Sequence, residues 1–540
     1  MLATLSAGAL LGQLISAFSG AHVGWLPYLD SLDLIDDEIV RVGALRLRAE
    51  RRLVRYEQWD NLVEMSRYGA VRSVASYFFE EAFEFERAEK SAATPAEPVD
   101  ELDTAMFNAQ LSSDLDAQID IAGRLFLVTG NVDTLFLASA MAEVRHGRLE
   151  AAAWTARTLA LFPDNKQAAE RLLLLLADAE ASEHLRAYAD ALTASKLGGA
   201  IVAVARASLA LLSEDPKGAL DALDAARPGA LSPPRASAML AARVMRLRGQ
   251  ALDRLRDYRA AAEAFLETGR RMSDRKDEIA HYRIKIEAAA RFVGSGETLP
   301  LDSHAVTIVG FPGSGAELLG RSLGEHPLIE SLEAVPGLEA ALSYLQRNAE
   351  EPAAETTESS AVRSEAVRRF REEAQRRRRK ASATCVAAIA PERMGYAQIL
   401  NGLGPEQRYL LVVRHPLDLA VNWVKREAPL TKGMPQPNAL EEFVALYDLV
   451  MERWFNTFKR DDPRVLEVRY ERLLSDPSGT LKAAAGIFGL PWEGAKLAAG
   501  LLTEKGSKTE STWRDYLFLF RTAEAKPLLK WAEFLGYEAK

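Results

Sequence analysis

Hydrophobic residues follow two different patterns along this chain. From about residue 101 to 297, alanine and leucine recur at the spacing of short amphipathic helices, one helix after another. After residue 303, longer helical patterns alternate with short apolar runs typical of buried strands, at residues 305–309, 384–389, 409–413 and 464–468. The patterns predict an all-α region followed by an α/β domain with a parallel sheet, in which ligands bind at the carboxyl ends of the strands.

Turn sequences recur within the helical region, at residues 147–152, 161–165, 215–220 and 256–262. These segments resemble tetratricopeptide (TPR) units, in which paired helices repeat about every 34 residues and stack into a solenoid. We expect residues 100–297 to form such a TPR-like helical repeat domain, with a groove that binds a protein or peptide partner. The alternative is an irregular all-α array without a peptide ligand.

Two short polar segments divide the chain. Residues 90–98 include two prolines and separate an N-terminal helical region, residues 1–95, from the repeats. Residues 294–302 include two glycines and a proline and lead into the α/β domain, residues 303–540. The N-terminal region carries an aromatic cluster that forms either core and docking surface or a peripheral contact with a membrane or partner: Tyr77, Phe78, Phe79, Phe83 and Phe85.

Cysteine content and hydropathy indicate the compartment. Cys385 is the single cysteine among 540 residues, which excludes an internal disulfide and a multi-cysteine metal site, and its apolar neighbours predict a buried thiol. The sequence contains no uninterrupted apolar stretch of about 20 residues. Its apolar N-terminus has no basic residue before Arg41, unlike a secretory signal. We therefore expect a cytoplasmic protein.

Acidic residues are in excess only before the α/β domain. The whole chain has a formal net charge of −9, whereas residues 303–540 contain 32 basic and 32 acidic residues. A long acidic helical region argues against nucleic-acid binding, which relies on a basic face.

The first apolar run of the α/β domain, residues 305–309, ends in a glycine-rich loop and then resumes as a helical pattern at Ala316. Such a loop lets successive backbone N–H groups and the start of the next helix point at one anion. Gly310 and Gly315 have the separation of a Walker loop, but Ala316 and Glu317 stand where that loop has lysine and serine or threonine. Nucleoside triphosphate hydrolysis is therefore not expected.

Several ordered motifs resemble the sulfotransferases that use PAPS (3′-phosphoadenosine 5′-phosphosulfate), in particular the bacterial branch that carries TPR repeats. The motifs are Gly310-Phe311-Pro312-x-Ser314-Gly315, His326-Pro327, Leu332-Glu333, Arg414-His415-Pro416-x-Asp418, Tyr470-Glu471-x-Leu473, Gly489-Leu490-Pro491-Trp492 and Phe534-Leu535-Gly536-Tyr537. The resemblance implies a three-layer, P-loop-like sulfotransferase domain with a parallel sheet. It also implies transfer of a sulfuryl group from PAPS to a hydroxyl acceptor, with release of PAP and without a metal.

The resemblance assigns roles to individual residues. Arg414 would bind the 3′-phosphate together with Asn422, which stands where the family has a serine and can still donate from its amide. Glu333 would be the base for the acceptor proton, the alternative being a surface carboxylate on a helix. The 5′-phosphosulfate would be bound by the loop residues Pro312, Gly313, Ser314, Gly315 and Ala316.

This chain departs from the family pattern at charged positions. Gly313 stands where the family has a lysine or arginine, Glu317 replaces a threonine, and residues 388–391 lack the Asp-Lys pair of the branch. Each missing cation would weaken stabilisation of the transition state. Two hypotheses follow: a working sulfotransferase in which Lys432, Arg393 or the basic run at residues 376–380 substitutes, or an inactive sulfotransferase fold that serves as a binding or structural scaffold.

Overall fold

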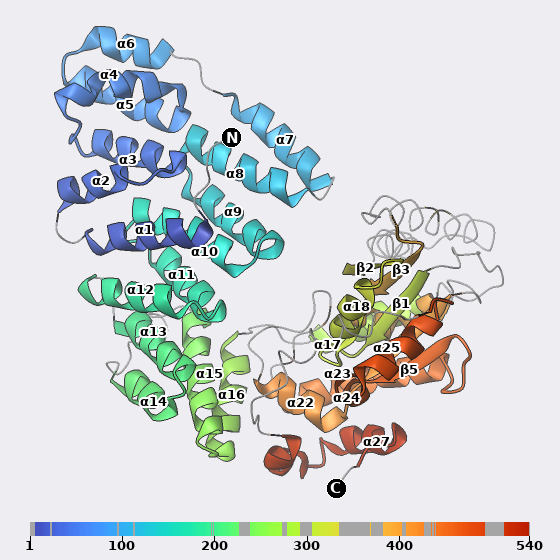
Figure 1. The fold of residues 1–540 in the computed structure, drawn as a ribbon. Helices are drawn as coiled ribbons and strands as arrows, with labels where there is room; N and C mark the ends of the chain where they lie inside the picture. Colours follow the sequence, from blue (N-terminus) through green and yellow to red (C-terminus); the bar gives the residue numbers. More distant parts are fainter. Residues whose placement is uncertain are drawn as a thin grey trace. The chain divides into compact units, whose positions relative to one another are not determined.

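A computed structural model describes residues 6–21, 24–93, 97–111, 114–195, 197, 199–225, 238–272, 278–291, 305–333, 365, 368, 382–401, 407–425, 434, 437, 439–491 and 512–538. The chain divides into two compact units, Met1–Leu255 and Arg256–Lys540 (Figure 1).

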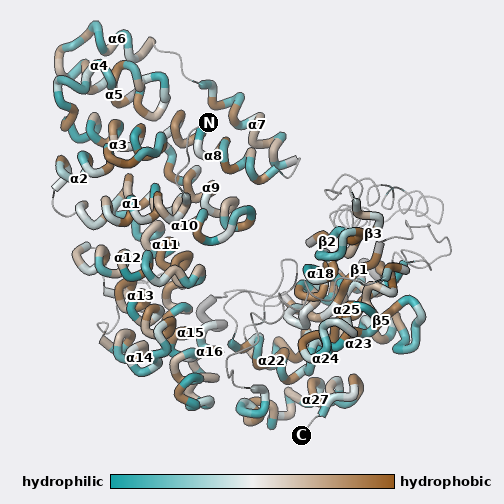
Figure 2. The backbone as a smooth tube through the Cα atoms, in the orientation of Figure 1, coloured by the Kyte–Doolittle hydropathy of each residue, from teal (hydrophilic) through white to brown (hydrophobic). Residues whose placement is uncertain are grey.

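The described part of the first unit is built from helices, along which hydrophobic and hydrophilic positions alternate (Figure 2). Neighbours in sequence contact one another, for example α8 with α9 and α13 with α14, as in antiparallel helix pairs. The elements are α1 (Ala7–Ser19), α2 (Trp25–Asp33), α3 (Glu38–Glu50), η1 (Tyr56–Gln58), α4 (Trp59–Glu64), η2 (Met65–Arg67), α5 (Gly69–Glu81), α6 (Phe85–Ala93), α7 (Val99–Leu111), α8 (Leu115–Thr129), α9 (Val132–Arg145), α10 (Arg148–Leu161), α11 (Lys166–Asp178), α12 (Ser182–Ala194), α13 (Gly199–Leu212), α14 (Pro216–Asp224) and α15 (Ala238–Arg254).

Polar side chains at the turns start several of these helices. The carboxylate of Asp215 accepts a hydrogen bond from the Gly218 amide at 2.9 Å at the start of α14, where Pro216 occupies the first turn. Asn165 caps α11 in the same way through the Ala168 amide, also at 2.9 Å. The turn sequences recognised in the chain are thus helix boundaries, whereas their TPR character stays a prediction.

One hydrophobic core extends through the first unit, from Leu10 on α1 to Ala251 on α15. α1 contacts α10 and α12, which lie far from it in sequence. Arg157 on α10 donates to Asp37, the capping residue of α3, at 2.9 and 3.0 Å. Residues 1–95 and the later helices therefore stabilise one another.

The aromatic cluster on α5 and α6 is divided between the core and the surface. Phe79 is fully buried, whereas Tyr77, Phe83 and Phe85 are exposed. Among the helices in the described parts of the chain, none is both long and apolar enough to span a membrane.

The second unit contains a five-stranded parallel sheet in the order β2-β3-β1-β4-β5. The order reverses at β1, because the chain first adds strands on one side of β1 and then on the other. Its elements are α16 (Tyr258–Met272), α17 (Glu278–Arg291), β1 (Ala305–Gly310), α18 (Ala316–Gly324), β2 (Ile329–Glu333), β3 (Cys385–Ile389), η3 (Pro391–Tyr396), α21 (Ala397–Asn401), β4 (Arg408–Val413), α22 (Pro416–Lys425), α23 (Leu440–Thr457), β5 (Val465–Arg469), α24 (Tyr470–Ser475), α25 (Pro477–Gly486), η4 (Trp513–Phe520) and α27 (Lys526–Phe534).

Successive residues of the strands belong to two separate cores, one on each face of the sheet. Ile308 and Val412 pack with α18, α24 and α25 on one face. Val309 and Leu411 pack on the other face with α17, α21, α22, α23 and α27. These three layers, with their parallel sheet, confirm the α/β fold predicted for the C-terminal half, and the helical first unit confirms the all-α region before it.

Two features differ from the sequence-based expectations. α16 and α17 were assigned to the helical repeats, yet Ala262, Tyr282 and Ile286 of these helices pack in the core of the second unit. β2 was not recognised as a strand, and Glu333 therefore ends a strand and does not lie on a helix. The predicted buried thiol is confirmed, since Cys385 on β3 is 2% exposed.

Candidate functional site

The glycine loop joins β1 to α18 at the carboxyl edge of the sheet, where the strand order reverses. Gly313 and Gly315 have φ values of +88° and +98°, in the left-handed region that glycine adopts without strain. The amide of Ser314 donates to the carbonyl of Phe311 at 2.9 Å and closes the turn. α18 begins at Ala316, as the sequence predicted, and crevices at such reversal points are where α/β proteins bind ligands.

The loop has hydrogen-bonding groups that have no partner among the described residues. Gly315 precedes α18 and has no side chain with which to cap the helix, so the first N–H groups of α18 can serve a bound acceptor. The hydroxyl oxygen of Ser314 is buried and has no hydrogen-bond partner among the described residues. A tetrahedral anion bound at this loop would satisfy both, so this part of the site fits a phosphate or sulfate group.

Arg414 follows β4 and contacts the glycine loop. Its Nη1 donates to the carbonyl of Gly313 at 3.2 Å, and its Nε and Nη2 lie 2.7 and 2.6 Å from Oδ2 of Asp418. The guanidinium lies over the ring of Tyr470, 4.4 Å from its centroid. The same ring lies against Gly315, where any Cβ would collide with it. Arg414 and the loop are thus brought together, and Asp418 balances the charge of Arg414.

Asn422 lies on α22 one turn after Asp418, so both belong to the same face of that helix. Its side chain is half-buried. α22 therefore presents a carboxylate followed by an amide on the face that Arg414 contacts.

Glu333 is the last residue of β2 and pairs in register with Ile389 of β3. Because Ile389 also pairs with Ile308, Glu333 lies level with a residue two positions before the loop. β3 lies between β2 and β1, which separates Glu333 from the loop strand by about 10 Å of backbone. Glu333 thus borders the site one strand away from the loop.

The histidines of the family-like motifs hold the backbone together. Nδ1 of His415 accepts from the Leu417 amide at 3.2 Å and its Nε2 donates to the carbonyl of Glu538 at 2.8 Å. Burial lowers the pKa of His415, in keeping with this neutral ring. His326 contacts the carbonyl of Pro491 through Nε2 at 3.0 Å. These contacts fix the segments around the sheet and leave neither histidine as the candidate base.

The end of β3 carries a charged pair that sequence reasoning only partly found. Glu392 and Arg393 open η3, their side chains are 12% and 10% exposed, and Oε1 of Glu392 lies 3.5 Å from Nε of Arg393. Burial, with a smaller contribution from the nearby Glu317 carboxylate, raises the pKa of Glu392 to about 7. Arg393 was considered as a substitute cation, but Glu392 was missed, although charged residues directly after a buried strand were the available signal.

The other candidate substitutes, Lys432 and the basic run at residues 376–380, lie outside the described residues. Within the described parts of the chain, no three Asp, Glu, His or Cys side chains come together as a metal site.

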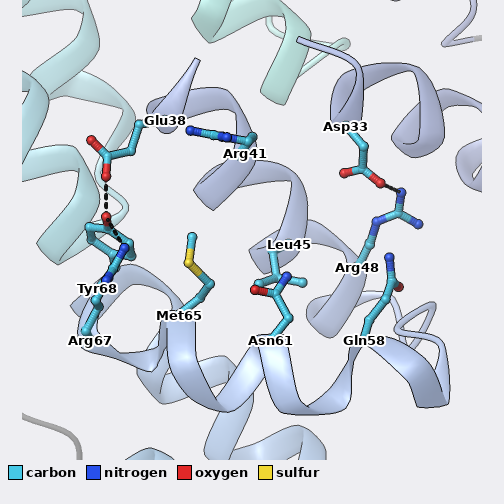
Figure 3. A pocket seen from close by; sticks show the side chains of 10 residues that line it. All are labelled: Asp33, Glu38, Arg41, Leu45, Arg48, Gln58, Asn61, Met65, Arg67 and Tyr68. Carbon is cyan, nitrogen blue, oxygen red and sulfur yellow. Dashed lines mark hydrogen bonds and ion pairs between the residues drawn. The ribbon is translucent and has the colours of Figure 1, made fainter. Parts of the chain in front are cut away.

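The first unit has a polar cavity of about 400 Å³. Side chains from α3 and from the segment η1–α4–η2 point toward one another across it, and Arg48 with Asp33 closes one end while Glu38 with Tyr68 closes the other (Figure 3). We call this cavity the α3–α4 groove. Its lining consists of Asp33, Glu38, Arg41, Leu45, Arg48, Gln58, Asn61, Met65, Arg67 and Tyr68.

Comparisons with known proteins agree with the resemblance of the second unit. Residues 305–494 match the model of the sulfotransferase family. Among solved structures, the chain is similar to the sulfotransferase domain from the curacin biosynthetic pathway, with 16% identity and a TM-score of 0.31 over 45% of this chain and 99% of that domain. A search of curated protein sequences finds no match. The glycine loop, Arg414 and Glu392 all lie within the residues that match this family model.

Proposed function

We propose that the second unit transfers a sulfuryl group from PAPS to a hydroxyl acceptor. The observation that carries this proposal is the glycine loop. Its left-handed glycines, the N–H groups at the start of α18 and the buried Ser314 hydroxyl, which has no partner among the described residues, could together bind one tetrahedral anion. The match of residues 305–494 to the sulfotransferase family supports a sulfuryl group over other anions.

The donor would be held at two places. The 5′-phosphosulfate would accept hydrogen bonds from the backbone of Pro312 to Ala316 and from the Ser314 hydroxyl. The 3′-phosphate would bind Arg414 and the amide of Asn422. Since Arg414 is paired with Asp418 and with the carbonyl of Gly313, donor binding would replace at least one of these contacts.

The reaction would break the bond between sulfur and the phosphate oxygen and form one between sulfur and the acceptor oxygen. The acceptor's proton would pass to a base, for which Glu333 is the proposed residue. The loop N–H groups and Ser314 would hold the transferring group in line and stabilise the charge that develops on its oxygens.

An inactive scaffold is the second candidate, and specific contacts favour it. Gly313 provides no cation, the Arg414 charge is already balanced by Asp418, and Glu317 adds a carboxylate to the first turn of α18. Arg393, one of the substitute cations, pairs with Glu392.

Calorimetric titration with PAP, using ATP as a control, tests the donor site. Binding of PAP but not ATP supports the proposal, and a subsequent assay of sulfuryl transfer from labelled PAPS to phenolic and sugar hydroxyls separates the enzyme from the scaffold. Absence of PAP binding by the folded protein rules out a PAPS site.

For the helical unit we infer a protein or peptide partner, and the α3–α4 groove supports this role. Asn61 and Gln58 offer amides to a peptide backbone, while Arg41 offers a charge to an acidic side chain. A displayed peptide library should enrich acidic sequences on the wild-type protein, and the Arg41→Glu, Asn61→Ala double variant should lose them; equal enrichment on both proteins would rule out this groove.

A cytoplasmic location and a peripheral membrane contact of residues 1–95 also stay proposals.

A further inference from the structure

A buried carboxyl group lies beside the glycine loop and has no role in the family-like pattern. η3 begins directly after β3, and the amide of Ala390 donates to the carbonyl of Ile308 at 2.9 Å. Ile308 precedes the loop glycine Gly310 by two residues. The segment that carries Glu392 therefore starts next to the end of β1. Its side chain is 12% exposed.

The groups that face Glu392 come from several elements. On η3 itself these are Arg393, at 3.5 Å, and the buried Tyr396. From α17, Tyr282 lies against Gly395 and Tyr396, with a buried hydroxyl that has no hydrogen-bond partner among the described residues. α21 and α23 contribute buried apolar and aromatic side chains to the same core, including the titratable Tyr447.

The remaining group is Glu317 in the first turn of α18, a second carboxylate that acts electrostatically on Glu392. Glu392 therefore has one cation at close range and one anion on the side of the loop. A further anion bound at the loop would add to the negative charge on that side, and a buried carboxyl group responds to such a charge by taking up a proton.

We propose that Glu392 takes up one proton when an anionic nucleotide binds at the glycine loop, so that proton concentration sets the affinity of the donor site. The inference rests on the proposed donor function of this loop. The proton comes from solvent and forms the O–H bond of the neutral carboxylic acid, and no other bond changes. The Glu392 pKa of about 7 places this exchange in the range where both forms are populated.

This linkage predicts that the affinity for the nucleotide falls as the pH rises. Below neutral pH Glu392 is already protonated and the nucleotide binds without further proton uptake at this residue. As the pH rises, Glu392 in the complex must take up a proton that is less available in solvent, and the affinity for the nucleotide falls. A shift of one pKa unit between the free and bound proteins corresponds to about a tenfold loss of affinity.

Calorimetric titration of the full chain with PAP tests this linkage, at about pH 6 and about pH 8.5 and in two buffers of different ionisation enthalpy. PAP has its own titrating phosphates, so the comparison is between wild type and Glu392→Gln, for which that contribution is the same. Wild type should lose about tenfold more affinity across this range than Glu392→Gln and should take up more protons.

Two further variants serve as controls. Glu325→Gln removes an exposed carboxylate at the far end of α18 from the loop and should behave as wild type. Glu392→Asp keeps a carboxyl group and should keep a pH dependence. Equal proton uptake and equal pH dependence in wild type and Glu392→Gln, with PAP bound to both, would overturn the linkage while leaving the donor site intact. Absence of PAP binding by any of these proteins at either pH, with circular dichroism showing that they are folded, would overturn the donor site itself.

Discussion

Replacing Glu392 with glutamine should stabilise the second unit at alkaline pH. In the folded protein the pKa of Glu392 is raised from 4.5 to about 7, mainly by burial, so the unfolded chain ionises this group more readily. Its stabilising contribution is therefore complete below about pH 4.5 and is lost as the pH rises through about 7. The full loss is about 3 kcal/mol, of which about 2 kcal/mol falls between about pH 5.5 and about pH 8.

Thermal unfolding followed by calorimetry measures this effect. Glutamine has nearly the shape of the protonated carboxyl group, so the transition of the second unit should decline with pH by about 5 °C less in Glu392→Gln than in wild type. Glu533→Gln on α27, an exposed position in the same unit, provides the matched control and should follow wild type. Parallel declines in wild type and Glu392→Gln would refute the reasoning, because they would mean that Glu392 ionises in the folded protein as it does in water.

Five further substitutions probe the donor site. Arg414→Ala should abolish measurable PAP binding in calorimetry, whereas Asp418→Asn, which frees the guanidinium from its partner, should strengthen it; unchanged affinity in both would exclude Arg414 as a phosphate ligand. Ser314→Ala should raise the free energy of unfolding by about 1 kcal/mol in denaturant titration, since it removes a buried hydroxyl that has no partner among the described residues, yet it should weaken PAP binding. A destabilised variant would show that the hydroxyl has a partner within the protein. Glu317→Thr should strengthen PAP binding several-fold, and equal affinity of Glu317→Thr and wild type would mean that Glu317 does not face the anion. Adding Gly313→Arg should increase the affinity less than an unstrained cation would, because an arginine at φ +88° costs about 1–2 kcal/mol.

Much of the fold follows from local sequence patterns. β1, β3 and β4 are short apolar runs followed by turns, and the loop glycines have the spacing that an anion-binding turn needs, so both were recognised. β2 has the sequence Ile-Glu-Ser-Leu-Glu, in which two carboxylates interrupt the apolar pattern. Among the described strands it lies at the edge of the sheet, next to β3 alone, and edge positions allow polar residues.

The candidate site was harder to predict because burial depends on residues far apart in the sequence. The motif residues Arg414 and Gly313 could be expected near one another from the edge that their strands share. The pairing of Arg414 with Asp418 lies four residues along one segment and could have been anticipated. The burial of Glu392 could not be anticipated, since η3 packs against α17, about 110 residues earlier in the chain, and against α23, which follows it in the chain.

The packing of α16 and α17 affects how the second unit can be produced alone. A protein cut at residue 303, where the sequence suggests a linker, would lack Ala262, Tyr282 and Ile286, which are 1%, 3% and 2% exposed. Each large apolar side chain that is removed lowers the stability by about 1.5–3 kcal/mol, because its burial is lost. The surface around Met394 and Tyr396 that these side chains cover would be exposed to water. Such a fragment would be prone to aggregation, and its failure to bind nucleotide would say nothing about the intact chain. A fragment that starts at Arg256 retains both helices and is the smallest piece whose inactivity would be informative.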